Sequence, residues 1–171
     1  STEPLDETHR TDVLALAAGG SLSCAAAPLP THPADVDRLI AHNRAGPRSV
    51  LTFAIRHEMQ VVGTVTLKRL EAEDNSAELS HWLGKAHQRK GYAFQAARLA
   101  LDHAFNVLLL DYVHAHSLKD NNKPSIGVLR RLGFQPDRVR PDLKTDGRFA
   151  QRYPDDHWTF FRLNRPVMAV R

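Results

Sequence analysis

A short basic turn, Gln88-Arg89-Lys90-Gly91-Tyr92-Ala93, stands between a strand-like run at 77–83 and a helix-like run at 93–108. The first backbone N–H groups of a helix have no partner inside the helix, and they carry the positive end of its dipole. A pyrophosphate can bind to such groups, and Gly91 lets the backbone approach it closely. The turn therefore predicts a phosphate-binding helix start. An ordinary helix start with a basic first turn is the alternative that this segment alone leaves open.

A second segment, residues 122–134, has the pattern of a capped amphipathic helix. Asn122 is a good N-cap residue and Pro124 suits the first turn, whereas Gly133 is a typical helix end, and Phe134 starts the next strand. The apolar residues between them recur at helical spacing: Ile126, Leu129 and Leu132. By itself this pattern indicates a helix without any ligand.

Together the two segments resemble the two signatures of the GNAT N-acetyltransferase superfamily. The turn fits Gln/Arg-x-x-Gly-x-Gly/Ala, the acyl-CoA-binding motif of that family, and residues 122–134 resemble Asn-x-x-Ser-Ile-x-x-Leu-x-x-Leu-Gly-Phe. The second segment follows the first by about thirty residues, as the family requires. Within the family, the chain most resembles the RimJ/RimL-type acetyltransferases, because of Trp82, Gly91-Tyr92-Ala93 and the late run Asp156-His157-Trp158.

The order of the expected elements matches this family. Helices are predicted at 8–18 and from 33 to about 46, strands at 50–56, 61–68 and 77–83, a helix at 93–108, a strand at 110–116, the helix of the second segment, and strands near 134–143 and 157–163. The resemblance implies an α/β (α+β) GNAT fold, with a mixed, mostly antiparallel central sheet, a splayed parallel strand pair and about four flanking helices, in a single domain over residues 1–171. The family usually opens with a strand, and only the few residues before Pro4 can supply it, so we expect a short first strand or a chain that begins late.

The resemblance also implies that the strands at 77–83 and 110–116 run parallel and splay apart, so that acetyl-CoA enters the gap as co-substrate. Main-chain groups left unpaired in the gap would bind the pantetheine amides, and N–H groups of the basic turn would bind the pyrophosphate. Asn122 would contact the cofactor or order its loop, with plain helix capping as the alternative. The expected cofactor-binding residues are His81, Leu83, Gln88, Arg89, Lys90, Gly91, Tyr92, Ala93, Phe94 and Asn122.

Acetyl transfer to an amine requires that the ammonium loses a proton, that the carbonyl oxygen is stabilised and that the thiolate leaves. Glu78 is the predicted base, directly or through water, because relatives often carry a glutamate here and alternation places it opposite Leu79. Binding loop backbone or a substrate cation is its alternative role. Ser125 is predicted to protonate the thiolate, as in RimL-like members, although a serine in a first helical turn commonly caps backbone N–H groups. Trp82 is predicted to line the acceptor site, with core packing as the alternative.

Two histidines, His114 and His116, share one face of a predicted strand, as paired metal ligands sometimes do. The sequence offers no evident third ligand, and the expected chemistry requires no metal. We therefore expect ordinary strand histidines and no metal cofactor.

Composition limits the other partners. The net charge is +4, but the basic residues are scattered, so we expect no nucleic-acid partner. No apolar run approaches a membrane span, and the N-terminal Ser1-Thr2-Glu3-Pro4 does not read as a signal peptide, so we expect no membrane partner. A single cysteine, Cys24, fits a reducing cytoplasm. The expected partners are acetyl-CoA and an amine acceptor, and dimers are common among relatives, so a homodimer is compatible with the resemblance.

The functional prediction is an N-acetyltransferase that transfers acetyl from acetyl-CoA to a primary amine by direct attack in a ternary complex. The acceptor would be a protein N-terminal amine or a small-molecule amine. The alternative is a non-catalytic CoA-binding sensor or interaction module, and a basic nucleic-acid binder is a third reading, which would show steeply salt-dependent DNA binding.

Overall fold

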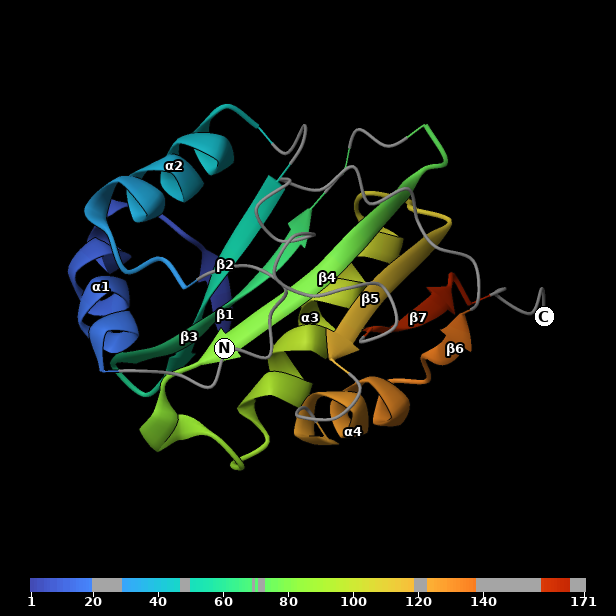
Figure 1. Cartoon of the computed structure of the whole chain (residues 1–171). Coiled ribbons are helices and arrows are strands. Elements are labelled where there is room, and N and C mark those ends of the chain that lie inside the picture. Colours follow the sequence, from blue (N-terminus) through green and yellow to red (C-terminus); the bar gives the residue numbers. More distant parts are fainter. Residues whose placement is uncertain are drawn as a thin grey trace.

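A seven-stranded sheet forms the centre of the part of the chain that the structure describes, and helices pack on both of its faces (Figure 1). This computed structural model describes residues 1–19, 29–46, 50–68, 70, 73–118, 123–137 and 158–166. The strands are β1 (Thr2–Pro4), β2 (Val50–His57), β3 (Gln60–Lys68), β4 (Ser76–Leu83), β5 (Tyr112–Leu118), β6 (Gln135–Asp137) and β7 (Trp158–Asn164). Their order across the sheet is β1-β2-β3-β4-β5-β7-β6.

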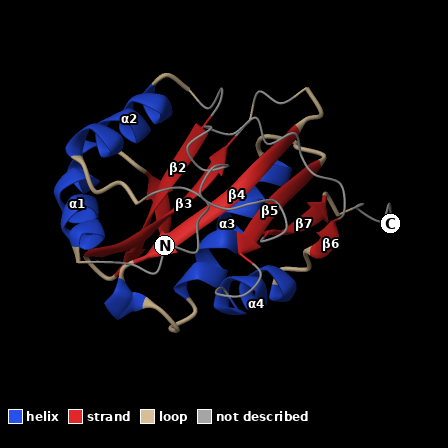
Figure 2. Cartoon of the chain, in the orientation of Figure 1, coloured by secondary structure: helices blue, strands red, loops and turns tan. Residues whose placement is uncertain are grey.

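Four α-helices lie in the described ranges, as predicted: α1 (Arg10–Ala18), α2 (Pro33–Arg44), α3 (Tyr92–Asn106) and α4 (Lys123–Arg131). Figure 2 shows how these helices and the strands are distributed over the molecule. Two 3-10 turns, Glu7–His9 and Lys85–His87, precede α1 and α3. Pro33 occupies the first turn of α2, where its missing N–H costs nothing because that group has no partner inside a helix.

The parallel pair of the sheet is β4 and β5, and these strands pair over three positions only. The paired residues are Ser76 with Tyr112, Ala77 with Val113, and Glu78 with His114. All other neighbouring strands are antiparallel. Because β4 continues to Leu83 and β5 to Leu118, the later halves of the two strands diverge. The predicted mixed, mostly antiparallel sheet with a splayed parallel pair is therefore confirmed.

Side chains alternate between two apolar layers. One face packs against α3 and α4, and its buried cluster includes Val65, Leu67, Leu79, Leu101, Phe134 and Phe161. The other face, over the first strands, packs against α1 and α2, and its cluster includes Leu5, Val13, Val36, Ile40, Ala54 and Trp82. Figure 1 shows α1 and α2 beside the first strands and α3 on the far side of the sheet.

The first strand is short, which confirms one of the two expectations for the start of the chain. Residues 2–4 pair antiparallel with residues 53–55 of β2. The Asn43 side chain fastens this edge, because its amide nitrogen donates to the carbonyl oxygens of Leu5 and Thr52, and its oxygen accepts from Thr52 N.

Several element boundaries differ from the prediction, and α3 ends at Asn106, two residues before the predicted end. The strand expected at 110–116 runs from Tyr112 to Leu118, because Leu109 adopts a positive φ of 56° and Leu110 N still donates to Ala104 O at the end of α3. The helix expected from residue 8 begins as a 3-10 turn before α1. Of the strand expected near 134–143, β6 covers Gln135–Asp137, and residues 138–143 lie outside the described ranges.

Within the described ranges, no helix combines the length and the apolar character that crossing a membrane would require.

Candidate active site

Glu78 is the acidic residue that the fold buries among the described residues, with 4% of its surface exposed. Its backbone lies in β4, opposite Lys68 of β3 and His114 of β5, at the last position where β4 and β5 pair. Its Oε1 atom lies 3.7 Å from Lys68 Nζ and 3.8 Å from His116 Nδ1. The nearly buried carboxylate of Glu78 thus lies between the Lys68 ammonium and the His116 imidazole.

The surroundings of Glu78 form a polar region on the sheet face opposite α3, which we call the polar face. It comprises Thr52, Thr66, Lys68, Glu78, Ser80, His114 and His116. The hydroxyl oxygens of Thr52 and Thr66 lie 3.2 Å apart, and Thr66 pairs with Ser80 across the ladder. Buried polar groups cost free energy unless they have partners, so a polar strip inside a sheet indicates a site rather than a core.

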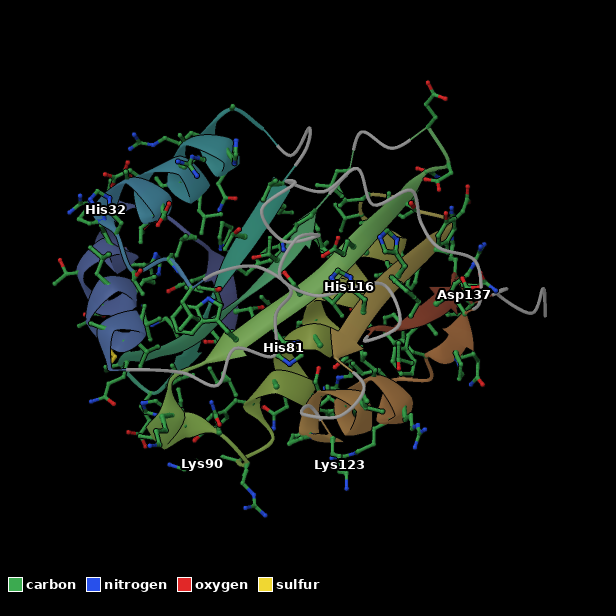
Figure 3. All side chains as sticks on the ribbon, viewed as in Figure 1. His32, His81, Lys90, His116, Lys123 and Asp137 are labelled. Atoms are coloured by element: carbon green, nitrogen blue, oxygen red, sulfur yellow. The ribbon has the colours of Figure 1, made fainter. Side chains whose placement is uncertain are left out.

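His116 projects from β5 close to the centre of the sheet (Figure 3). Its side chain is 7% exposed, and its ring centroid lies 6.1 Å from that of Phe160 on β7. Burial lowers the pKa of His116 from its ordinary value of 6.5; the Glu78 carboxylate opposes this shift, and the Lys68 ammonium adds to it. The imidazole is therefore neutral near pH 7.

Trp82 lies on the same sheet face as Glu78, as alternation predicts, but four residues further along β4. It is 7% exposed and belongs to the cluster formed with α1 and α2. This packing agrees with the alternative reading of Trp82 as a core residue. Its predicted contact with an acceptor stays a prediction.

The splayed half of β4 holds the two residues predicted to offer main-chain groups, His81 and Leu83. His81 lies in the strand after the last paired residue, and burial lowers the pKa of its imidazole to about 4. The Leu83 carbonyl oxygen accepts a hydrogen bond from Gln88 Nε2 at 3.2 Å. Gln88 therefore ties the turn back to the end of β4, a positioning role that its place in the motif did not reveal.

The basic turn enters α3 through Gly91, which has a φ of 83° and no side-chain cap over the helix start. A Cβ at this position would meet nothing within 4 Å, so the space in front of the helix is open. Arg89, Lys90 and Gly91 are exposed. Lys90 and Lys123, near the starts of α3 and α4, lie along the same edge of the molecule in Figure 3. This edge combines helix N–H groups with positive charge, which suits a polyanion.

The next residues of the motif fasten the helix start to its neighbours. The ring centroid of Tyr92 lies 4.7 Å from that of His57 at the end of β2. The Arg131 guanidinium carbon lies 4.4 Å from the ring centroid of Phe94. Tyr92, Ala93 and Phe94 are all half-buried. Their side chains therefore pack, and only their backbone N–H groups remain suited to an anion.

Two serines of β5 and α4 are buried. Ser125 is 4% exposed in the first turn of α4, and Ser117 is fully buried near the end of β5. Ser117 Oγ has no hydrogen-bond partner among the described residues. Asn122, predicted to contact the cofactor, lies outside the described ranges.

No three His, Cys, Asp or Glu side chains gather in a metal-binding arrangement within residues that the structure describes. The pair His114 and His116 does share a face, as predicted, but its charged neighbours are Glu78 and Lys68.

The arrangement of sheet, splay and glycine turn is matched by known proteins. The model of the acetyltransferase (GNAT) domain family matches residues 3–135. This chain belongs to the GNAT family. It is 29% identical over 109 residues to the uncharacterized N-acetyltransferase p20 of Bacillus licheniformis, covering 63% of this chain and 61% of the relative. It is 33% identical over 82 residues to spermidine N(1)-acetyltransferase of Escherichia coli K12, covering 48% and 44%.

A dodecameric structure of spermidine N-acetyltransferase from Vibrio cholerae shares the fold, with a TM-score of 0.69 over 96% of this chain and 93% of that one, at 16% identity. The chain thus spans 61% or less of the length of these two curated relatives, and the solved structure is too distant to report more than the fold. The GNAT assignment is confirmed, whereas the RimJ/RimL subtype stays a prediction.

Sequence reasoning missed Lys68 altogether and gave His116 no role beyond that of a strand histidine. Alternation places both on one face of their own strands, but their contact with Glu78 depends on the register of three strands. The pattern that could have indicated them is a titratable residue on the same face of each of three successive strands.

Proposed function

We propose that this protein is an N-acetyltransferase that transfers acetyl from acetyl-CoA to a primary amine by direct attack within a ternary complex. GNAT acetyltransferases use acetyl-CoA as co-substrate. The observation that carries the proposal is the divergence of β4 and β5 immediately after Glu78, where β4 leads through the glycine turn into the uncapped start of α3.

The residues around the splay fit a long, polar thioester ligand. Strand residues 79–82 of β4 have no ladder partner on β5, so their main-chain groups suit the pantetheine amides. The buried Ser117 hydroxyl adds a polar group beside the gap. The open helix start at Gly91, with the exposed Arg89 and Lys90, suits the phosphates.

Chemistry would take place where the splay opens beside the polar face. Glu78 attracts the ammonium of the acceptor and drives the loss of its proton, directly or through a neighbouring group. The amine then attacks the thioester carbonyl, and Ser125 is proposed to protonate the departing thiolate. No residue in this scheme forms a covalent intermediate, which is why a ternary complex is the simplest order of events.

The acceptor class we favour is a small amine, because a curated relative is named for spermidine and the polar face presents a buried carboxylate. A protein N-terminal amine is the other acceptor to test. Polyamines carry several ammonium groups, and a buried carboxylate is a strong partner for one of them.

The test combines acetyl-CoA with spermidine, an amino-acid amide and an N-terminal peptide, and follows acetylated product by mass spectrometry together with free CoA thiol. We expect stoichiometric acetylamine and CoA from at least one amine, and little product from Glu78→Gln protein. Binding of acetyl-CoA without acetylation of any of the three amines would favour the CoA sensor. If the protein neither bound acetyl-CoA nor acetylated an amine, both the acetyltransferase and the CoA-sensor interpretations would be wrong.

A further inference from the structure

Three titratable side chains from three adjacent strands meet at one point of the polar face: Lys68 from β3, Glu78 from β4 and His116 from β5. Their side chains are 25%, 5% and 7% exposed, in that order. Charged residues are seldom buried to this extent unless they are paired or serve a function. The cluster is therefore more than a surface ion pair.

Of the three residues, His116 is the one that lies beyond the last paired position of β4 and β5. The β4–β5 ladder ends at the pair Glu78 and His114, and His116 is the next residue of β5 on the same face. Its ring thus stands where the two strands begin to separate, on the face that carries Glu78. A group at this position borders both the polar face and the gap proposed for the thioester.

We propose that His116 is the catalytic residue that takes the proton from the acceptor's ammonium, and that Glu78 is a positioning residue that orients the imidazole and stabilises its charged form. This inference rests on the proposed acetyltransferase function and adds to it the identity of the proton acceptor. It follows the general logic of a base that is itself held by a carboxylate.

The proton balance is complete with groups already named. The ammonium gives one proton to the unprotonated ring nitrogen of neutral His116, and the resulting amine forms a bond to the carbonyl carbon of the thioester. The carbon–sulfur bond then breaks, Ser125 gives its hydroxyl proton to the thiolate to form free CoA thiol, and the second proton that the nitrogen must lose restores the Ser125 hydroxyl. The imidazolium of His116 returns its proton to water, so that one proton is released for each acetyl group transferred.

Distance and charge support this division of roles. His116 Nδ1 lies 3.8 Å from Glu78 Oε1, which is too long for a hydrogen bond but short enough for strong coupling, and catalytic contacts often tighten only when substrate binds. Burial keeps the pKa of His116 below 6.5, so the base form prevails at neutral pH. Glu78 opposes that shift and thereby favours the imidazolium once it forms.

The charged and titratable groups facing His116 come from each neighbouring strand. Lys68 on β3 lowers the pKa of His116, and Glu78 on β4 raises it. His114 lies two residues earlier on β5, and its ring centroid lies 6.3 Å from that of Tyr112. On β7, His116 pairs with Phe160, and Arg162 pairs with His114 and stacks on the Tyr112 ring. Among the described residues, Lys68 and Glu78 are the charged groups that shift the pKa of His116.

The other histidines of β4 and β5 are less suited. His114 lies within the paired part of the ladder, before the splay. His81 lies beside the splay, but alternation places it on the face of Leu79 and Leu83, against α3, and its pKa of about 4 makes it a weak base.

The first test measures the pKa of His116 directly and does not depend on enzyme activity. Protein labelled at histidine is titrated by NMR, and the His116 signal is assigned by its loss in His116→Gln. We expect a pKa below 6.5 in the unmodified protein, a lower value in Glu78→Gln, and a higher value in Lys68→Met. Values that do not move in these opposite directions would contradict the coupling.

The second test compares these pKa values with the apparent pKa on the acid side of the pH profile of kcat/KM for acetylation of spermidine, which we call the acid limb. We expect the limb to move with the NMR pKa in Glu78→Gln and Lys68→Met, and His116→Gln to lower kcat/KM by about 10²–10⁴ while acetyl-CoA affinity is kept. His103→Gln is the matched control, because His103 on α3 also has a pKa lowered by burial but packs against Phe53 on the other face. His103→Gln should leave both kcat/KM and the position of its acid limb unchanged.

The two proposals fail in distinguishable ways. If the unmodified protein acetylates spermidine but the limb stays fixed while the His116 pKa moves, or if His116→Gln keeps the full rate, His116 is not the base and the acetyltransferase function stands. If no acetylation occurs although acetyl-CoA binds, the proposed function falls, and this inference falls with it.

Discussion

The carboxylate of Glu78 and the imidazole of His116 lie 3.8 Å apart on two parallel strands that stop pairing at Glu78. His116 is the next residue of β5 on the same face as His114, so its contact with Glu78 runs diagonally between the two strands at the end of their ladder. The imidazole and the carboxylate therefore lie together at the point where the two strands diverge.

Glu78→Gln should separate turnover from cofactor binding. The amide keeps the shape of the side chain but removes the charge that faces Lys68 and His116, so we expect kcat to fall by about 10²-fold or more. Acetyl-CoA affinity should change by less than about threefold, because the change does not touch the start of α3. Steady-state kinetics and calorimetry on the same preparation measure both. Equal losses of affinity and turnover would point instead to general unfolding of the site.

Gly91→Ala should weaken acetyl-CoA binding about tenfold, and Gly46→Ala should not. Both glycines have a positive φ, 83° and 90°, and a Cβ at either would meet nothing within 4 Å. Each substitution therefore carries the same backbone strain, about 1–2 kcal/mol, but only Gly91 stands at the start of α3. Urea unfolding and calorimetry distinguish strain from binding. If both variants bind acetyl-CoA alike, the turn is not the phosphate site.

Gly63→Ala should destabilise the fold strongly, whereas Gly127→Ala should not. A Cβ at Gly63 would overlap the Trp82 carbonyl oxygen and come within 2.9 Å of Leu83 Cα, so β3 and β4 would have to move apart. We expect a loss of about 2 kcal/mol or more in the free energy of unfolding. At Gly127, inside α4, a Cβ meets nothing within 4 Å, and alanine should add about 0.5–1 kcal/mol. Equal effects in urea unfolding would argue against the close approach of β3 and β4.

His81 should make the fold less stable as the pH falls from 6.5 toward 4. Its folded pKa of about 4 lies below the unfolded value of 6.5, so the unfolded chain binds the extra proton in this window and gains stability. Its contribution is complete above pH 6.5, and roughly 1–2 kcal/mol should be lost at pH 5. His81→Gln has no such proton, so the difference in unfolding free energy between the two proteins should change by this amount from pH 7 to pH 5. An unchanged difference would show that the imidazole is solvated in the folded state.

Much of the fold could be predicted from local patterns. Alternation located β2, β3 and β4, and helical spacing located α3. Gly133 ends its helix as predicted, with a φ of 91° and Phe134 N bonded back to Leu129 O. These features depend on residues close together in sequence, which is why the sequence alone indicates them.

The site was less accessible to sequence reasoning. Glu78 could be placed on a face, but the proximity of Lys68 and His116 depends on the register of β3, β4 and β5, and on where the parallel ladder ends. The bulge between Ile55 and Arg56 shifts the register of β2 against β3, and no local pattern marked it. The packing of Trp82 against α1 and α2 likewise follows from helix placement, which periodicity does not define.

The central claim is that the gap between β4 and β5 and the start of α3 together bind acetyl-CoA. Calorimetric titration of the protein with acetyl-CoA, with dephospho-CoA and ATP as comparison ligands, tests it most directly. We expect one-site binding of acetyl-CoA with a Kd of about 1–100 μM, weaker binding of dephospho-CoA, and still weaker binding of ATP, which lacks the pantetheine arm. No heat of binding from folded protein, or equal affinity for ATP, would contradict the account and leave the glycine turn as an ordinary helix start.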